Sequence, residues 1–214
     1  MIGLTVDGRE ISAQEGQNLL TTCLQHGIYI PHLCFMDDMV DPPASCRLCF
    51  VEIEGMPFPV ASCRVHPAPG MVVKTDTERV RRLQRSALRL LLSVHHVDCR
   101  NCPSNKKCVL QDLAKFLGIP LKSKKLEHLE REIAIDLTHP LFDFNPHRCI
   151  LCGKCIYVCQ QRNGTGLLTF AKRGFDTVVA CFGDQDLNRS SCQDCHACVE
   201  VCPVSAIFLK SASS

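Results

Sequence analysis

Two stretches of the chain repeat one cysteine pattern: CILCGKCIYVCQ at residues 149–160 and CQDCHACVEVCP at residues 192–203. In each stretch, successive cysteines are separated by two, two and three residues. Gaps of two residues allow three thiolates to face a single inorganic centre across a tight loop, whereas the fourth cysteine lies where the chain leaves that loop. The pattern therefore predicts two bound inorganic centres whose fourth ligands are exchanged between the two stretches.

This spacing is that of bacterial ferredoxins with two [4Fe–4S] clusters. The first cluster is expected on three cysteines of one stretch and the last of the other: Cys149, Cys152, Cys155 and Cys202. The second is expected on the remaining four: Cys159, Cys192, Cys195 and Cys198. Gln160 replaces the proline that normally follows the fourth cysteine, whereas Pro203 retains it. The alternative is zinc, although zinc sites seldom use three cysteines at two-residue gaps twice over.

Cysteine makes up 17 of the 214 residues, a level typical of a disulfide or metal scaffold. Residues 1–16 lack the basic region followed by an apolar run that marks a signal peptide. No uncharged apolar run approaches the ~20 residues of a membrane span. We therefore expect a cytoplasmic protein without direct membrane insertion, and in that reducing compartment clustered cysteines bind metal more often than they form disulfides.

The net charge of +2 conceals an uneven distribution. Residues 78–125 hold 12 lysines and arginines against 3 acidic residues, whereas residues 1–77 hold 4 against 9 and residues 126–214 hold 8 against 10. A basic block can indicate nucleic-acid binding. Here it surrounds a cysteine group, and basic neighbours also favour anionic thiolate-bound clusters, so no nucleic-acid partner is expected.

The region before this block predicts a small mixed domain. Two strands are expected at 2–8 and 9–13, around the turn pair Asp7-Gly8, and a helix at 17–27 that ends at Gly27. A hairpin that turns near Glu54-Gly55 is expected at 49–63, and a closing strand at 71–76.

Two helices are expected next, at 78–94 and 109–118. The first carries arginines on one side and, on the other, an apolar stripe expected to be core: Val80, Leu83, Ala87, Leu90, Leu91 and Val94.

A further cysteine group lies in the N-terminal region: Cys34, Cys46, Cys49 and Cys63. Its gaps of eleven, two and thirteen residues are not the plant-type ferredoxin spacing, so spacing alone leaves the group ambiguous between zinc and [2Fe–2S]. The segments YIPHLC, SCRLCFVEIEG and ASC resemble the [2Fe–2S] domain that begins the large iron–sulfur subunit of respiratory complex I and many [FeFe]-hydrogenases. That resemblance implies a [2Fe–2S] cluster on these four cysteines.

The segment HHVDCRNCPSNKKCVLQ resembles the [4Fe–4S] site of the same families, which has one histidine ligand and three cysteines in the pattern H-x3-C-x2-C-x5-C. The resemblance implies a cluster on four residues: His95, Cys99, Cys102 and Cys108. His96 competes with His95, and the three residues between histidine and cysteine in the motif select His95.

The resemblance covers nearly the whole chain and implies an α+β fold in several parts. Residues 1–77 would form a β-grasp [2Fe–2S] ferredoxin-like domain, and residues 78–118 a small helical [4Fe–4S] module with one His and three Cys ligands. A connecting segment with Pro120 and Pro140 as breakers would follow at 119–145, and a bacterial-type 2×[4Fe–4S] ferredoxin domain at 146–210. The cofactors would be one [2Fe–2S] cluster and three [4Fe–4S] clusters.

Two cysteines are left over. Cys23 and Cys181 lie among apolar residues and are expected to be buried core thiols. His147 and His196 are expected beside a cluster or facing solvent, not as ligands.

No phosphate-binding glycine loop occurs, and the chain ends where the related hydrogenases and complex I subunits continue into further domains. We therefore expect no catalytic residues.

The resemblance implies a free-standing subunit like the diaphorase-side small subunit of soluble NAD(P)-linked [NiFe]-hydrogenases. Its partners would be a flavin/NAD(P)H-binding subunit and a hydrogenase catalytic subunit, between which single electrons pass. Two alternatives stay open: the same relay in an NAD-linked formate dehydrogenase or electron-bifurcating complex, and a free-standing polyferredoxin carrier. The uneven charge favours a subunit, since small diffusing carriers are usually strongly acidic.

Overall fold

The computed structural model describes residues 1–122, 128–129, 133–136, 139, 141–164, 166–181, 192 and 195–210. The chain forms two compact units, one of Met1–Leu90 with Leu113–Ile119 and the other of Leu91–Asp112 with Pro120–Ser214. Both contain helices and strands, which confirms the mixed composition of the fold. Part of the predicted connection 119–145, including Pro140, lies outside the described residues. No helix of the described residues is long and apolar enough to span a membrane.

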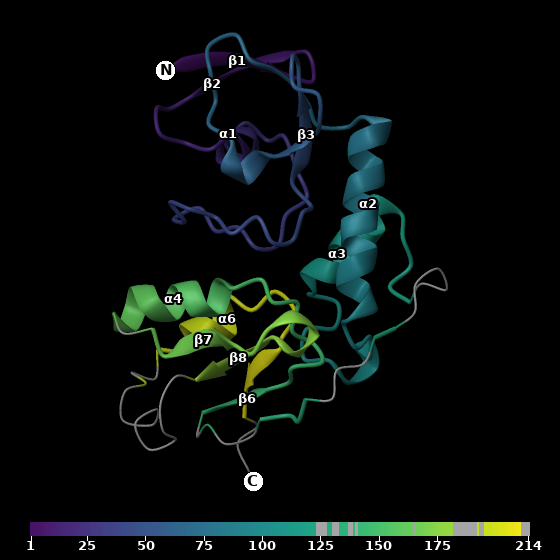
Figure 1. Cartoon of the computed structure of the whole chain (residues 1–214), viewed down its shortest axis with the longest axis vertical. Helices are drawn as coiled ribbons and strands as arrows, with labels where there is room; N and C mark the ends of the chain where they lie inside the picture. The colour runs from purple at the N-terminus through teal and green to yellow at the C-terminus, as the bar shows by residue number, and fades with distance from the viewer. Residues whose placement is uncertain are drawn as a thin grey trace. The chain divides into compact units, whose positions relative to one another are not determined.

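The first unit is built on a five-stranded sheet in the order β2-β1-β5-β3-β4. Figure 1 labels β1, β2 and β3 of this sheet. The strands occur where they are predicted: β1 (Ile2–Val6), β2 (Arg9–Ala13), β3 (Phe50–Ile53), β4 (Val60–Ala61) and β5 (Val72–Lys74). β1 pairs antiparallel with β2 and parallel with β5, whereas β3 pairs antiparallel with both β4 and β5. Cys34, Cys46 and Cys49 lie on the segment that leads into β3, and Cys63 lies between β4 and β5, the two strands that flank β3 in the sheet.

Helix α1 (Leu19–Gln25) packs into the core of this unit. It begins where Asn18 Oδ1 accepts a hydrogen bond from the Thr21 N–H at 2.9 Å, a side-chain cap that satisfies one of the first backbone donors. Gly27 follows the helix with a φ of 73°, a conformation that glycine adopts without strain. The predicted helix and its stop are confirmed.

Both helices expected in the basic block are present: α2 (Glu78–Ser93) and α3 (Val109–Leu117). The expected core stripe of α2 is wrong at Leu90, which is 63% exposed, whereas Leu88 and Leu92 are buried. The buried side passes through Gln84, a polar residue that an apolar pattern does not include. The Gln84 Nε2 donates a hydrogen bond to the Phe50 carbonyl of β3 at 3.3 Å, which satisfies part of the polar group of this buried side chain.

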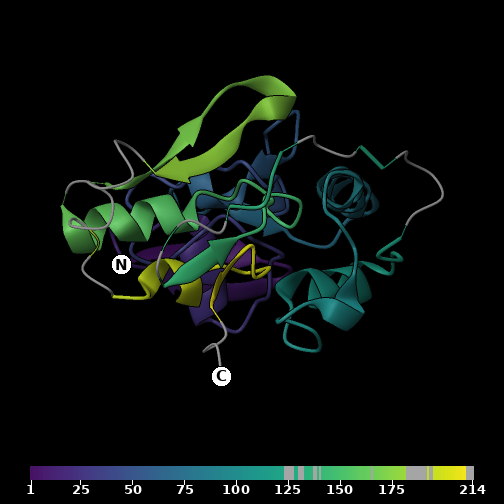
Figure 2. The same cartoon turned by 90° about the horizontal axis from the view of Figure 1, so that it is seen from below.

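In its described residues, the second unit contains two antiparallel two-stranded sheets, β6–β9 and β7–β8. Along the chain, one helix lies between β6 and β7 and another between β8 and β9. The β7–β8 hairpin is the light-green pair in Figure 2. The elements of the repeat region are β6 (Phe142–Phe144), α4 (Lys154–Asn163), β7 (Leu168–Ala171), β8 (Val178–Cys181), α6 (Ala197–Glu200) and β9 (Ile207–Leu209).

The repeat in the sequence is also a repeat of backbone conformation. Gly153 and His196 each stand four residues after the first cysteine of their stretch, and each precedes a helix, α4 or α6. Both have left-handed backbone conformations, with φ of 77° and 55°. The two cysteine loops therefore turn into their helices in the same way, although only one of them uses glycine.

Candidate iron–sulfur centres

The four N-terminal cysteines lie together in the first unit, and all four are buried. The Cys46 thiol hydrogen-bonds to the Cys34 sulfur, which lowers the pKa of Cys34 to about 5 and raises that of Cys46 well above its usual value. In the same way, Cys63 lowers the pKa of Cys49 to about 7, and its own pKa is raised. The charge of Cys34 also acts on Cys49 and Cys63, so the two pairs are neighbours.

Backbone geometry holds the loop that carries two of these thiols. Arg47, between Cys46 and Cys49, has a left-handed φ of 52°, which turns the chain sharply within the CxxC segment. The Ser62 N–H and hydroxyl both donate to the Cys49 carbonyl, at 2.9 and 2.8 Å. Because Cys63 follows Ser62 directly, these two bonds keep it next to the CxxC loop.

This donor set fits a small iron–sulfur cluster. Thiolates are the soft ligands that select zinc or iron–sulfur groups. The pKa values of Cys46 and Cys63 are raised mainly by the hydrogen bonds that each thiol donates to a neighbouring sulfur, then by burial and by the charges of the other thiolates, so ionising all four thiols carries a free-energy penalty. A bound cationic core removes that penalty by replacing the shared protons.

The middle group is centred on η2 (Cys99–Asn101) in the second unit. Burial raises the pKa of Cys108, and the charges of Cys102 and Cys99 raise it further, so these three thiols are neighbours. His95 is buried, whereas His96 is exposed. Burial lowers the pKa of His95 to about 4, which keeps its ring neutral at pH 7.

The hydrogen bonding of His95 suits a metal ligand. Its Nδ1 lies 2.8 Å from the Arg148 carbonyl. Since a carbonyl only accepts, Nδ1 carries the proton, and the Nε2 lone pair is left as the coordinating position. Ligand histidines commonly donate their other N–H to a carbonyl in this way.

Thiols of the two repeat stretches lie close to one another, in sets that overlap with the two predicted ligand groups. Burial raises the pKa of Cys155, and the nearby charges that raise it further come from four residues: Cys152, Cys149, Cys202 and Cys198. Burial raises the pKa of Cys198 to about 12, with added contributions from three residues: Cys159, Cys192 and Cys195. Each group therefore combines thiols of both stretches, and Cys198 also approaches the first group.

Two sulfurs of the first group accept backbone hydrogen bonds. The Leu151 N–H lies 3.4 Å from Cys149 Sγ, and the Ala206 N–H lies 3.1 Å from Cys202 Sγ. Leu151 has a left-handed φ of 53°, which aims its N–H back at the sulfur two residues earlier. Such bonds stabilise negative charge on sulfur and thereby tune the potential of a bound cluster.

No disulfide joins any of the seventeen cysteines, all of which lie in the part of the chain that the structure describes. Within that same part, no three His, Cys, Asp or Glu side chains are placed to bind a single metal ion directly. The assignment of the sixteen side chains as cluster ligands stays a prediction.

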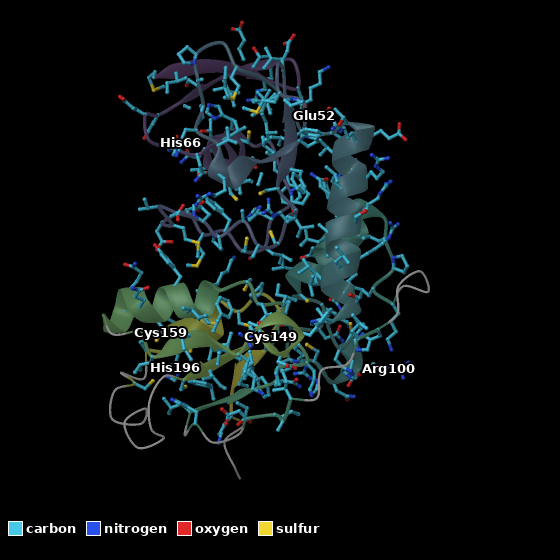
Figure 3. The ribbon with its side chains drawn as sticks, in the orientation of Figure 1. Glu52, His66, Arg100, Cys149, Cys159 and His196 are labelled. Atoms are coloured by element: carbon cyan, nitrogen blue, oxygen red, sulfur yellow. The ribbon has the colours of Figure 1, made fainter. Side chains whose placement is uncertain are left out.

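The two remaining cysteines differ from each other. Cys23 is completely buried in the core of the first unit, as expected. The expectation for Cys181 is wrong, because this residue is only half-buried and lines a cavity instead of the core. The same cavity is lined by the second predicted ligand group and by His196, which Figure 3 labels together with Cys159. Sequence reasoning missed Cys181 because its neighbours along the chain are apolar.

Three family models match consecutive parts of the chain. Residues 1–78 match a 2Fe-2S iron–sulfur cluster binding domain, residues 84–121 the NADH-ubiquinone oxidoreductase-G iron–sulfur binding region, and residues 148–206 a 4Fe-4S dicluster domain. Each matched region contains at least one of the cysteine-rich segments.

Similar proteins match nearly the whole chain. The NADP-reducing hydrogenase subunit HndD of Solidesulfovibrio fructosivorans is 34% identical over 97% of this chain, and an NADH-quinone oxidoreductase subunit of Rhizobium meliloti is 35% identical over 97%. The chain spans only 36% and 24% of these two relatives. A chain from the crystal structure of an NAD+-reducing [NiFe]-hydrogenase in the H2-reduced state is 30% identical, with a TM-score of 0.88, 99% of this chain covered and 88% of that chain. The chain therefore belongs to the family of iron–sulfur proteins that these subunits of NAD(P)-linked hydrogenases and NADH-quinone oxidoreductases represent.

Proposed function

We propose that this chain is the electron-transfer subunit of a multi-subunit oxidoreductase. It would relay single electrons through one [2Fe–2S] and three [4Fe–4S] clusters between a flavin/NAD(P)H-binding subunit and a hydrogenase catalytic subunit. The observation that carries the proposal is the similarity to a chain of an NAD+-reducing [NiFe]-hydrogenase that has nearly the same extent. A cytoplasmic location is proposed from the concentration of cysteines without disulfides.

We further assign the architecture in four parts: a β-grasp [2Fe–2S] domain, a [4Fe–4S] module with mixed His and Cys ligands, a connecting segment and a 2×[4Fe–4S] ferredoxin domain, at 1–77, 78–118, 119–145 and 146–210. The mixed sheet with α1 in its core supports the first assignment. The two cysteine loops that turn in the same way before α4 and α6 support the last.

When bound, each cluster supplies one-electron redox chemistry. The chain controls that chemistry through the surroundings of the ligands. Apolar core residues keep water from Cys49 and Cys63. The N–H groups of Leu151 and Ala206 stabilise charge on the sulfurs to which they donate. His95 supplies a neutral donor in place of a thiolate.

The proposal is tested by isolating the protein from its native host by gel filtration under anaerobic conditions. We expect it to co-elute with a flavoprotein and a hydrogenase subunit, and we expect NAD(P)H to bleach the iron–sulfur absorption of the isolated complex. Elution of the chain alone at 23.8 kDa would contradict the subunit role and favour a free carrier. Co-elution with a formate dehydrogenase would show that this enzyme, and not a hydrogenase, is the terminal partner.

A further inference from the structure

One cavity of the second unit has five cysteines in its wall. Four of them are the predicted ligands of one [4Fe–4S] cluster, Cys159, Cys192, Cys195 and Cys198. The fifth is Cys181. A cubane needs four ligands, so this wall offers one thiol more than a cluster requires.

The β7–β8 hairpin fixes the position of this fifth thiol. Cys181 is the last residue of β8 and pairs directly with Leu168 of β7, which also lines the cavity. Directly paired residues place their side chains on the same face of a sheet. Val179, two residues earlier on the same strand, is buried on that face as well. Cys181 therefore faces the cavity because of strand register.

The electrostatic surroundings of Cys181 agree with this position. The charged groups that act on it are Asp136, Cys159 and Cys192, two of which are predicted ligands. Cys23 differs, because it lies in the apolar core of the other unit, which also contains Cys49 and Cys63, and the charge that acts on it comes from Asp7. The two cysteines left over by the motif count are therefore not equivalent.

We propose that Cys181 is a reserve ligand of this centre, able to bind the iron that loses its sulfur when Cys192 or Cys159 is removed. The inference rests on the proposed function, since it requires a cluster on these residues. In the exchange, an Fe–Sγ bond forms to Cys181, its thiol proton passes to solvent, and no electron is transferred. In the unaltered chain Cys181 binds no iron.

Two histidines also line the cavity and are the competing donors, His139 and His196. The His139 ring stacks on Phe142, with ring centroids 3.8 Å apart and an interplanar angle of 17°, and this contact restricts its rotation. His196 precedes α6 in a left-handed conformation that the turn of the loop requires. A thiolate is also the softer donor and matches the three ligands that remain.

The test compares four proteins prepared anaerobically as the full chain: unaltered, Cys181→Ser, Cys192→Ala, and Cys192→Ala with Cys181→Ser. Iron per chain and the EPR spectrum after dithionite reduction are measured for each. We expect Cys181→Ser to keep the iron content of the unaltered protein, and Cys192→Ala to keep it with an altered EPR signal. The double variant is expected to lose up to about four iron atoms, the content of one cubane.

A matched control combines Cys192→Ala with Cys23→Ser, which removes the other spare cysteine and is expected to retain iron. If Cys192→Ala proves insoluble, the same comparison is made with Cys159→Ala. Equal iron loss in the single and double variants would overturn the proposal, because Cys181 would then not retain the cluster. Equal iron retention in both would also overturn it, because a histidine or solvent would then be the ligand that replaces Cys192. Iron loss from Cys181→Ser alone would overturn the reserve role. Absence of iron–sulfur signals from the unaltered protein would contradict the proposed function itself.

Discussion

The N-terminal thiols and the thiols of the repeat lie in different surroundings. Cys49 and Cys63 are members of an apolar core that a five-stranded sheet and α1 complete. In the described part of the repeat region, the sheets have only two strands, α6 has four residues, and Cys195 is exposed. Two-stranded sheets are marginal on their own. Cys149, Cys155 and Cys159 of the repeat are nevertheless buried. We therefore expect the first site to be supported by protein packing and the second to depend more strongly on what its thiols bind.

Removal of iron is the largest perturbation of this comparison. When an iron chelator and dithionite extract the clusters, residues 146–210 are expected to unfold, because metal binding and folding are coupled there. Residues 1–77 are expected to keep the sheet. Hydrogen–deuterium exchange with peptide resolution measures both regions in one sample. Equal loss of protection in both, or equal retention, would contradict the difference drawn between them.

Removal of single thiols separates the two sites more finely. Cys155→Ala is expected to lose up to about four iron atoms and Cys49→Ala about two, according to the clusters assigned to them. Cys23→Ala is the matched control, since it alters an equally buried cysteine that is no ligand. Iron analysis and the thermal transition of each variant give the result. A similar iron loss from the Cys23 variant would show that packing, and not ligation, controls iron content.

The charge of the predicted ligand can be changed at His95. His95→Cys replaces a neutral donor with an anionic one, so the midpoint potential of that cluster is expected to fall by on the order of 100 mV, by analogy with the effect of histidine ligands in Rieske centres. His96→Ala is the control, because His96 is exposed. EPR-monitored redox titration measures both variants. An unchanged or raised midpoint in His95→Cys would contradict the ligand assignment.

The smallest expected effects come from the backbone of the repeat. Gly153→Ala is expected to lower the free energy of unfolding by about 1 kcal/mol, because a residue with a side chain is strained at a left-handed φ. Space is not the cause, since an added Cβ would lie 3.7 Å from the Phe170 ring, an ordinary contact. His196→Gly is expected to stabilise by a similar amount. Urea unfolding of the iron-loaded proteins measures both shifts, and shifts of the same sign would contradict the equivalence of the two loops.

Features set by neighbouring residues could be predicted from the sequence. The helix stop at Gly27 is one such feature, and the structure confirms it. Features set by distant residues could not. The buried Gln84 side chain donates a hydrogen bond to the Phe50 carbonyl, 34 residues away. The position of Cys181 depends on its pairing with Leu168 across the hairpin, which the composition of the strand does not specify.

The most direct test of the account is the iron content and EPR spectrum of anaerobically prepared protein before and after reduction with dithionite. One two-iron and three four-iron clusters predict about 14 iron atoms per chain and four reducible centres. A colourless protein without EPR signals after reduction, or one holding two to four zinc ions, would contradict the account.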